Sequence, residues 1–155
     1  MSRFTALLIL ALLASWSLAA EAAIAITSTR IWPAQDYTRL TLESKQPITY
    51  KLFVIKNPER LVIDLQDVEL RGPLEELASK IANDDPYIKS VRVGRFKPDI
   101  VRLVLDLKTG VKPQLFNLNP VAEYGHRLVL DVYPTIPVDP LMALLKTESE
   151  LAAHP

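Results

Sequence analysis

One unit of about 63 residues occurs twice in this chain. The segment RLVIDL at residues 60–65 returns as RLVLDV at 127–132, and TRLTL at 38–42 corresponds to VRLVL at 101–105. The offset between the copies is 62 or 63 residues early in the unit and 67 at its end, so the second copy carries a small insertion. A long unit that occurs only twice predicts two similar halves that share one core, since solenoids repeat shorter units many times.

Within each unit, apolar residues alternate with polar ones. Leu61, Ile63 and Leu65, for example, alternate with Arg60 and Asp64. A period of two is typical of half-buried strands, and clusters of Pro, Gly, Asn and Asp separate the alternating segments. The pattern predicts four strands per unit, at residues 24–32, 37–43, 48–55, 60–66, 88–95, 100–107, 112–117 and 127–133. Many short strands at this spacing predict a mainly β fold, either a sandwich or a barrel.

The segment between the two units has a different period. Leu74, Leu77 and Ile81 recur at helical spacing directly after Pro73, which favours the first turn of a helix. We therefore expect a short connecting helix that covers the core.

Both ends of the chain predict segments outside the domain. Residues 1–22 contain Arg3, an apolar run and a final Ala-Glu-Ala, the pattern of a signal peptide for the general secretory route. An uncleaved anchor is the alternative, but the run is short for a span of about 20 residues, and cleavage would leave no membrane segment. Residues 23–134 form one domain, and prolines in residues 135–155 predict a linker, with Asp139 capping a second short helix.

Composition excludes several functions. Equal numbers of basic and acidic residues, 18 of each, give no bulk attraction for nucleic acid. The chain has no cysteine, and His126 and His154 lack the spacing of a zinc site, which needs three protein ligands. We attribute the acidic pair at 75–76 to the start of the helix and the pair at 84–85 to a solvated turn. We expect no catalytic residue, metal or cofactor in this chain.

Several motifs, in order, resemble the AMIN domain over residues 24–134. They are TRIWP at 29–33, DYTR at 36–39, KNPERLVIDL at 56–65, IKSVRVG at 88–94 and YGHRLVLDVYP at 124–134. More narrowly, the chain is similar to the AMIN domain at the N-terminus of periplasmic N-acetylmuramoyl-L-alanine amidases of the AmiB and AmiC kind. These enzymes split septal peptidoglycan during cell separation, and AMIN domains also occur in pilus secretins.

The resemblance implies a β-sandwich of two small sheets with an internal two-fold likeness. It implies a non-catalytic module that binds peptidoglycan in the periplasm and targets a cell-wall amidase to the division septum, with divisome proteins as further partners. Zinc is then expected only in a catalytic domain that this sequence does not contain, beyond the linker at 135–155. The alternative is a protein-docking module that binds a divisome or pilus-secretin partner by strand addition.

We expect the peptidoglycan-binding residues among arginines on the outer side of one sheet in each unit. These are Arg30, Arg39 and Arg60 in the first unit and Arg92, Arg102 and Arg127 in the second. Guanidinium groups bind carboxylates, such as those of stem peptides, at two points, and sugar rings stack on aromatic side chains such as Trp32 and Tyr37. The alternative is that Arg39 and Arg60 pair with Asp64 on a neighbouring strand.

Overall fold

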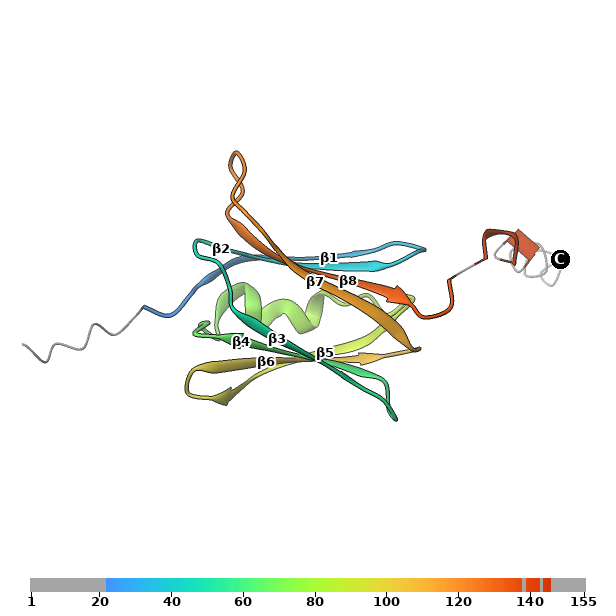
Figure 1. Ribbon diagram of the computed structural model, residues 1–155, viewed down its shortest axis with the longest axis horizontal. Helices are drawn as coiled ribbons and strands as arrows, with labels where there is room; N and C mark the ends of the chain where they lie inside the picture. Colours follow the sequence, from blue (N-terminus) through green and yellow to red (C-terminus); the bar gives the residue numbers. More distant parts are fainter. Residues whose placement is uncertain (1–21, 138, 143, 146–155) are drawn as a thin grey trace, which may run out of the picture.

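The computed structural model describes residues 22–137, 139–142 and 144–145. In this part of the chain, eight strands form two antiparallel sheets that pack face to face, with one short helix at their side (Figure 1). The strands are β1 (Ile26–Pro33), β2 (Thr38–Ser44), β3 (Tyr50–Ile55), β4 (Arg60–Gln66), β5 (Ile88–Lys97), β6 (Ile100–Leu107), β7 (Val111–Leu118) and β8 (His126–Pro134). The predicted two-sheet sandwich is confirmed, and every strand boundary agrees to within two residues.

Each sheet takes two strands from each unit of the repeat. Sheet I has the order β1-β2-β8-β7, and sheet II has the order β3-β4-β6-β5. Exchanging every strand for its counterpart in the other unit converts the order of sheet I into that of sheet II. The duplication therefore appears in space as an approximate two-fold relation between the sheets.

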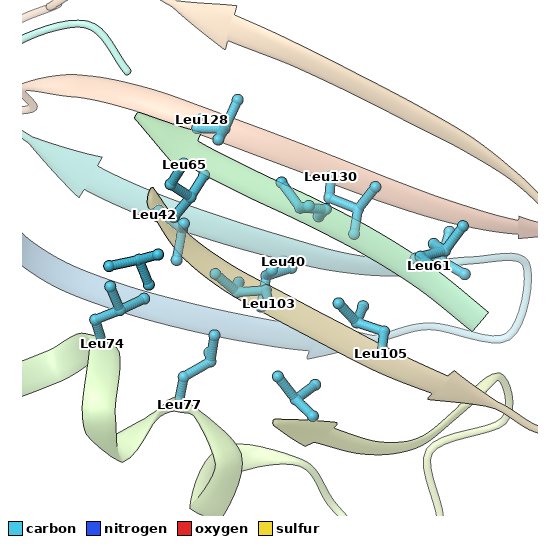
Figure 2. Packing of buried hydrophobic residues seen from close by; sticks show 14 of the residues in the cluster. Leu40, Leu42, Leu61, Leu65, Leu74, Leu77, Leu103, Leu105, Leu128 and Leu130 are labelled. Carbon is cyan, nitrogen blue, oxygen red and sulfur yellow. The ribbon is translucent and has the colours of Figure 1, made fainter. Parts of the chain in front are cut away.

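The core lies between the two sheets. Leu61 and Leu65 of sheet II are fully buried against Leu40 and Leu130 of sheet I, as Figure 2 shows. Burying a leucine side chain contributes about 1.5–3 kcal/mol. Among the described residues, the buried apolar residues of the core cluster all fall between Ile26 and Val132, within the predicted domain.

The connecting segment forms the 3₁₀ helix η1 (Gly72–Lys80), which contacts the edge strands β1 and β5. Pro73 lies in its first turn, as predicted, and Leu74 and Leu77 are fully buried in the core. The Lys80 ammonium group donates to the Thr29 carbonyl oxygen at 2.8 Å, which fixes the end of the helix to β1. The prediction of a helix that covers the core is confirmed.

Asp85 contradicts the prediction of a solvated turn, because it is 0% exposed. Its Oδ1 accepts hydrogen bonds from the backbone N–H groups of Tyr87 at 2.9 Å and Ile88 at 2.7 Å. The Thr38 hydroxyl donates to the same carboxylate at 3.0 Å. The turn is present, but the Asp85 carboxylate points inward. Its hydrogen bonds link the start of β2 to the start of β5.

The two predicted terminal segments lie largely outside the described residues. Residues 1–21 belong to the predicted signal peptide and are not described. Beyond β8, residues 140–142 and 144–145 are helical, and the Leu141 N–H donates to Asp139 Oδ1 at 2.9 Å. This is the cap predicted at Asp139.

Candidate functional site

The outer face of each sheet carries three rows of side chains that correspond between the sheets. In sheet I the rows are Trp32–Arg39–Asp131–Gln114, Arg30–Thr41–Val129–Phe116 and Ser28–Glu43–Arg127–Leu118. In sheet II they are Gly94–Arg102–Asp64–Lys51, Arg92–Val104–Val62–Phe53 and Ser90–Asp106–Arg60–Ile55. Residues in a row lie directly across the strands from one another, on the side opposite the core leucines.

The arginines do not share one sheet within each unit, so that expectation was wrong. Sheet I carries Arg30, Arg39 and Arg127, whereas sheet II carries Arg60, Arg92 and Arg102. The reason is that the fourth strand of each unit pairs with the second strand of the other unit, so the third and fourth strands of a unit lie in the other sheet from its first two. Each face thus combines arginines from both units.

A bidentate ion pair occupies the equivalent place on each face. Arg39 Nε and Nη2 donate to Asp131 Oδ1 and Oδ2, both at 2.7 Å. On the other face, Arg102 Nε and Nη2 donate to Asp64 Oδ1 and Oδ2 at 2.7 and 2.9 Å. The proposed pairing of Asp64 with Arg39 and Arg60 is wrong, because each aspartate pairs with an arginine of the other unit.

These contacts shift the pKa values of Asp64, Arg39 and Arg102. Hydrogen bonding to Arg102 lowers the pKa of Asp64, against the opposing effect of burial. The hydrogen bond to Asp131 raises the pKa of Arg39, and that to Asp64 raises the pKa of Arg102. In each pair the arginine and the aspartate come from different units, so the two ion pairs link the units across each sheet.

A second ion pair is also repeated. On sheet I, Ser28 Oγ and Arg30 Nη2 donate to Glu43 Oε2 at 3.2 and 3.1 Å. The same contacts recur on sheet II, at 2.9 Å and 3.2 Å, between the counterparts Ser90, Arg92 and Asp106. Four of the six arginines are therefore engaged within their own sheet.

We expect the free energy of unfolding to fall as the pH drops below about 4. Burial opposes ionisation of Asp106, but the hydrogen bonds from Ser90 and Arg92 outweigh it, so its pKa is lowered like that of Asp64. Such groups stabilise the fold above their unfolded pKa, near 3.8, and lose this effect as the pH falls through the folded value. Urea unfolding at a series of pH values measures the slope of the free energy of unfolding against pH. Asp64→Asn should flatten it, and an unchanged slope in that variant would contradict this assignment.

Arg60 and Arg127 are counterparts that differ from the other four arginines. Within residues 22–137, neither of them forms an ion pair. The Nε atom of each is buried and has no hydrogen-bond partner among the described residues. Arg127 Cζ lies 5.2 Å from the centroid of the Tyr124 ring. Of the six arginines on the outer faces, these two are the ones that form no ion pair among the described residues.

The loop before β8 approaches sheet I closely at Gly125. Its N–H donates to Glu43 Oε1 at 2.9 Å, and a Cβ atom at this position would lie 2.6 Å from the Ser44 carbonyl oxygen. A side chain therefore cannot be added here without moving the backbone of β2 or the loop that carries Tyr124.

Gly125→Ala should lower the free energy of unfolding by about 1–3 kcal/mol, because overpacking forces backbone shifts. Gly94→Ala is the matched control, since a Cβ there meets no atom within 4 Å. We expect the control to change stability by less than about 0.5 kcal/mol. Urea denaturation followed by circular dichroism compares the two variants. Equal losses of stability would show that the close approach to the Ser44 carbonyl oxygen does not cause the destabilisation.

Three aromatic side chains, the exposed Trp32 and the half-buried Tyr37 and Tyr133, lie at one end of the outer face of sheet I. Trp32 is 60% exposed and stands nearly perpendicular to Tyr37, with the ring centroids 6.3 Å apart. The Tyr37 and Tyr133 rings pack at a centroid distance of 5.1 Å. Tyr133 was missed as a site residue, although the period of two from Asp131 along β8 places it on the same face.

Among residues 22–137, 139–142 and 144–145, no group of three or more His, Asp or Glu side chains could hold a metal ion. His126 begins β8, and His154 lies outside the described residues. In the same described ranges, no helix has the length and apolar character needed to cross a membrane.

Comparison with known proteins identifies relatives of this chain. The family described as AMIN domain matches residues 28–132. The chain is 51% identical over 124 residues to N-acetylmuramoyl-L-alanine amidase AmiC of Escherichia coli O6:H1, an alignment covering 78% of this chain and 30% of that protein. It is 47% identical over 121 residues to the protein of the same name from Neisseria meningitidis serogroup B, covering 77% of this chain and 29% of the relative. The chain thus spans about 30% of the length of the curated relatives that it matches.

Proposed function

Because the chain belongs to the AMIN domain family, we propose that it is a non-catalytic module that binds peptidoglycan and directs a cell-wall amidase to the division septum. In this proposal the parent protein is an N-acetylmuramoyl-L-alanine amidase, as the names of both relatives suggest. The chain enters the periplasm by the general secretory route, and residues 135–155 lead to a zinc-dependent catalytic domain. Divisome proteins are further partners at the septum.

The free guanidinium groups of Arg60 and Arg127 carry the binding proposal. Peptidoglycan stem peptides present carboxylates, and an arginine fork binds a carboxylate through two parallel hydrogen bonds. The forks of Arg39 and Arg102 are already occupied by aspartates, so we assign them to the scaffold, together with Arg30 and Arg92. Trp32 and Tyr37 supply aromatic surface for sugar rings.

Cosedimentation with purified sacculi tests this function directly. The chain expressed from residue 23 keeps the whole core and should sediment with sacculi at low salt. Sedimentation should weaken as salt is raised, because surface ionic contacts are screened. A protein that stays wholly in the supernatant at low salt would defeat the binding proposal.

Replacing both Arg60 and Arg127 with glutamine should weaken binding to sacculi at least tenfold. A hydrogen bond to a charged group contributes about 1.5–3 kcal/mol, and about 1.4 kcal/mol corresponds to a tenfold change in affinity. The matched control replaces Lys45 and Lys89, two exposed cations outside the outer-face rows, and removes the same charge. Equal losses in the two double variants would indicate a non-specific charge effect.

The same pair of variants separates this function from strand addition. A partner strand would bind through backbone groups of an edge strand, so its affinity should survive the loss of Arg60 and Arg127. The names of the relatives do not favour this alternative.

A further inference from the structure

We propose that the glycan strand of peptidoglycan is bound on sheet I alone, by an aromatic ledge formed by Trp32, Tyr37 and Tyr133. This inference rests on the proposed function and deepens it, because it assigns the sugar rings to one of two outer faces that otherwise correspond. Three observations support it. Sheet II has no counterpart of the ledge, the Trp32 ring is exposed, and the ledge adjoins a cleft.

The two-fold relation breaks down at the ledge. The ion pairs recur on both faces, but the counterpart of Trp32 on sheet II is Gly94. Tyr37 and Tyr133 correspond to Ile100 and Gln66, which lie opposite each other between β4 and β6. Sheet II therefore lacks aromatic rings at the places where sheet I has three.

The ring of Trp32 is available for stacking. It is 60% exposed, and no guanidinium or ammonium group of the described residues lies over it. Phe96 on sheet II is 50% exposed, but Arg102 Cζ lies 3.5 Å from its ring centroid and covers one face. The apolar face of a sugar ring needs an open aromatic face, which Trp32 provides.

A cleft of about 420 Å³ adjoins the ledge at Tyr133. Its polar lining includes Asp36, Lys112, Gln114 and Thr135, which can bind sugar hydroxyl and acetamido groups. The volume lies within the range of about 300–1,000 Å³ typical of small-ligand sites.

The equivalent place on sheet II is smaller. It is lined by Thr49, Lys51 and Gln66, the counterparts of Lys112, Gln114 and Tyr133, and encloses about 110 Å³. This volume lies below the range of about 300–1,000 Å³ typical of small-ligand sites. A second cleft on sheet II, of about 250 Å³, is also below that range, and Arg102 covers the Phe96 ring that lines it.

Glycan strands from which stem peptides have been removed provide the probe, with intact sacculi measured in parallel. Trp32→Ala should weaken binding to the stripped strands about three- to tenfold, and Trp32→Phe should restore most of the loss. Phe96→Ala, which removes an exposed ring from sheet II, is the matched control and should bind like the wild type. Trp32 lies outside the core, so its variants should fold.

The outcomes separate this inference from the proposed function. If the wild type binds intact sacculi but not stripped strands, the sugar-binding ledge is overturned while peptidoglycan binding stands. The ledge is also overturned if Phe96→Ala loses as much affinity as Trp32→Ala, or if Trp32→Ala loses none. A wild-type chain that binds neither probe overturns both proposals.

Discussion

Asp85→Ala should lower the free energy of unfolding by about 3–5 kcal/mol, the largest effect we expect from a single polar substitution. The carboxylate is fully buried and accepts hydrogen bonds from Tyr87 N, Ile88 N and the Thr38 hydroxyl. Alanine would leave these three buried donors without a partner, and each unsatisfied group costs about 1–3 kcal/mol. Urea denaturation followed by circular dichroism measures the change.

Two variants control for this effect. Asp84→Ala removes the exposed neighbouring carboxylate and should change stability by less than about 0.5 kcal/mol. Asp85→Asn keeps one carbonyl acceptor at the position, so its loss should be smaller than that of Asp85→Ala. If Asp85→Ala lowers the free energy of unfolding by less than about 1 kcal/mol, water replaces the carboxylate, and the carboxylate is not what joins β2 to β5.

Removing either central aspartate, by Asp131→Ala or Asp64→Ala, should cost about 2–3 kcal/mol. Each aspartate accepts two short hydrogen bonds from an arginine, and a hydrogen bond to a charged group contributes about 1.5–3 kcal/mol. The loss should stay below that of a fully buried pair, since the side chains of Arg39 and Arg102 are 38% and 31% exposed and regain water.

A double-mutant cycle isolates the pairwise energy. We expect the coupling of Arg39 with Asp131 to equal that of Arg102 with Asp64 within about 0.5 kcal/mol, because the two sites have the same geometry. The ion pair of Arg71 with Glu69, whose arginine side chain is 75% exposed, is the control and should couple by less than about 1 kcal/mol. Coupling at only one central pair would contradict the structural equivalence of the faces.

The sequence predicted the elements of this fold better than their arrangement. Alternation along residues 60–65 depends only on which side chains are buried, so it placed β4 without knowledge of its neighbours. Strand order cannot be predicted in this way. Two tandem units have the same alternation whether each forms its own sheet or exchanges strands with the other. The partner of Arg39 could not be identified without knowing that β2 lies beside β8.

Local context also limited the prediction of single polar residues. Asp84 and Asp85 are adjacent, identical and followed by proline, a composition typical of solvated turns, yet only Asp85 is buried. Its burial follows from the backbone donors at the start of β5, which become visible only when the chain is folded. Tyr133 was within reach of the sequence, because the period of two that placed Asp131 outward also applies two residues later.

The central claim is that peptidoglycan binds to the outer faces of the two sheets, through residues that the repeated ion pairs leave free. Amide chemical shifts of the ¹⁵N-labelled chain, titrated with a soluble disaccharide-peptide fragment of peptidoglycan, test it most directly. We predict that the largest shifts cluster around Arg60, Arg127 and Trp32 and that the core positions stay unchanged. Shifts confined to the open edge of β3, or no shifts at millimolar fragment, would contradict the claim.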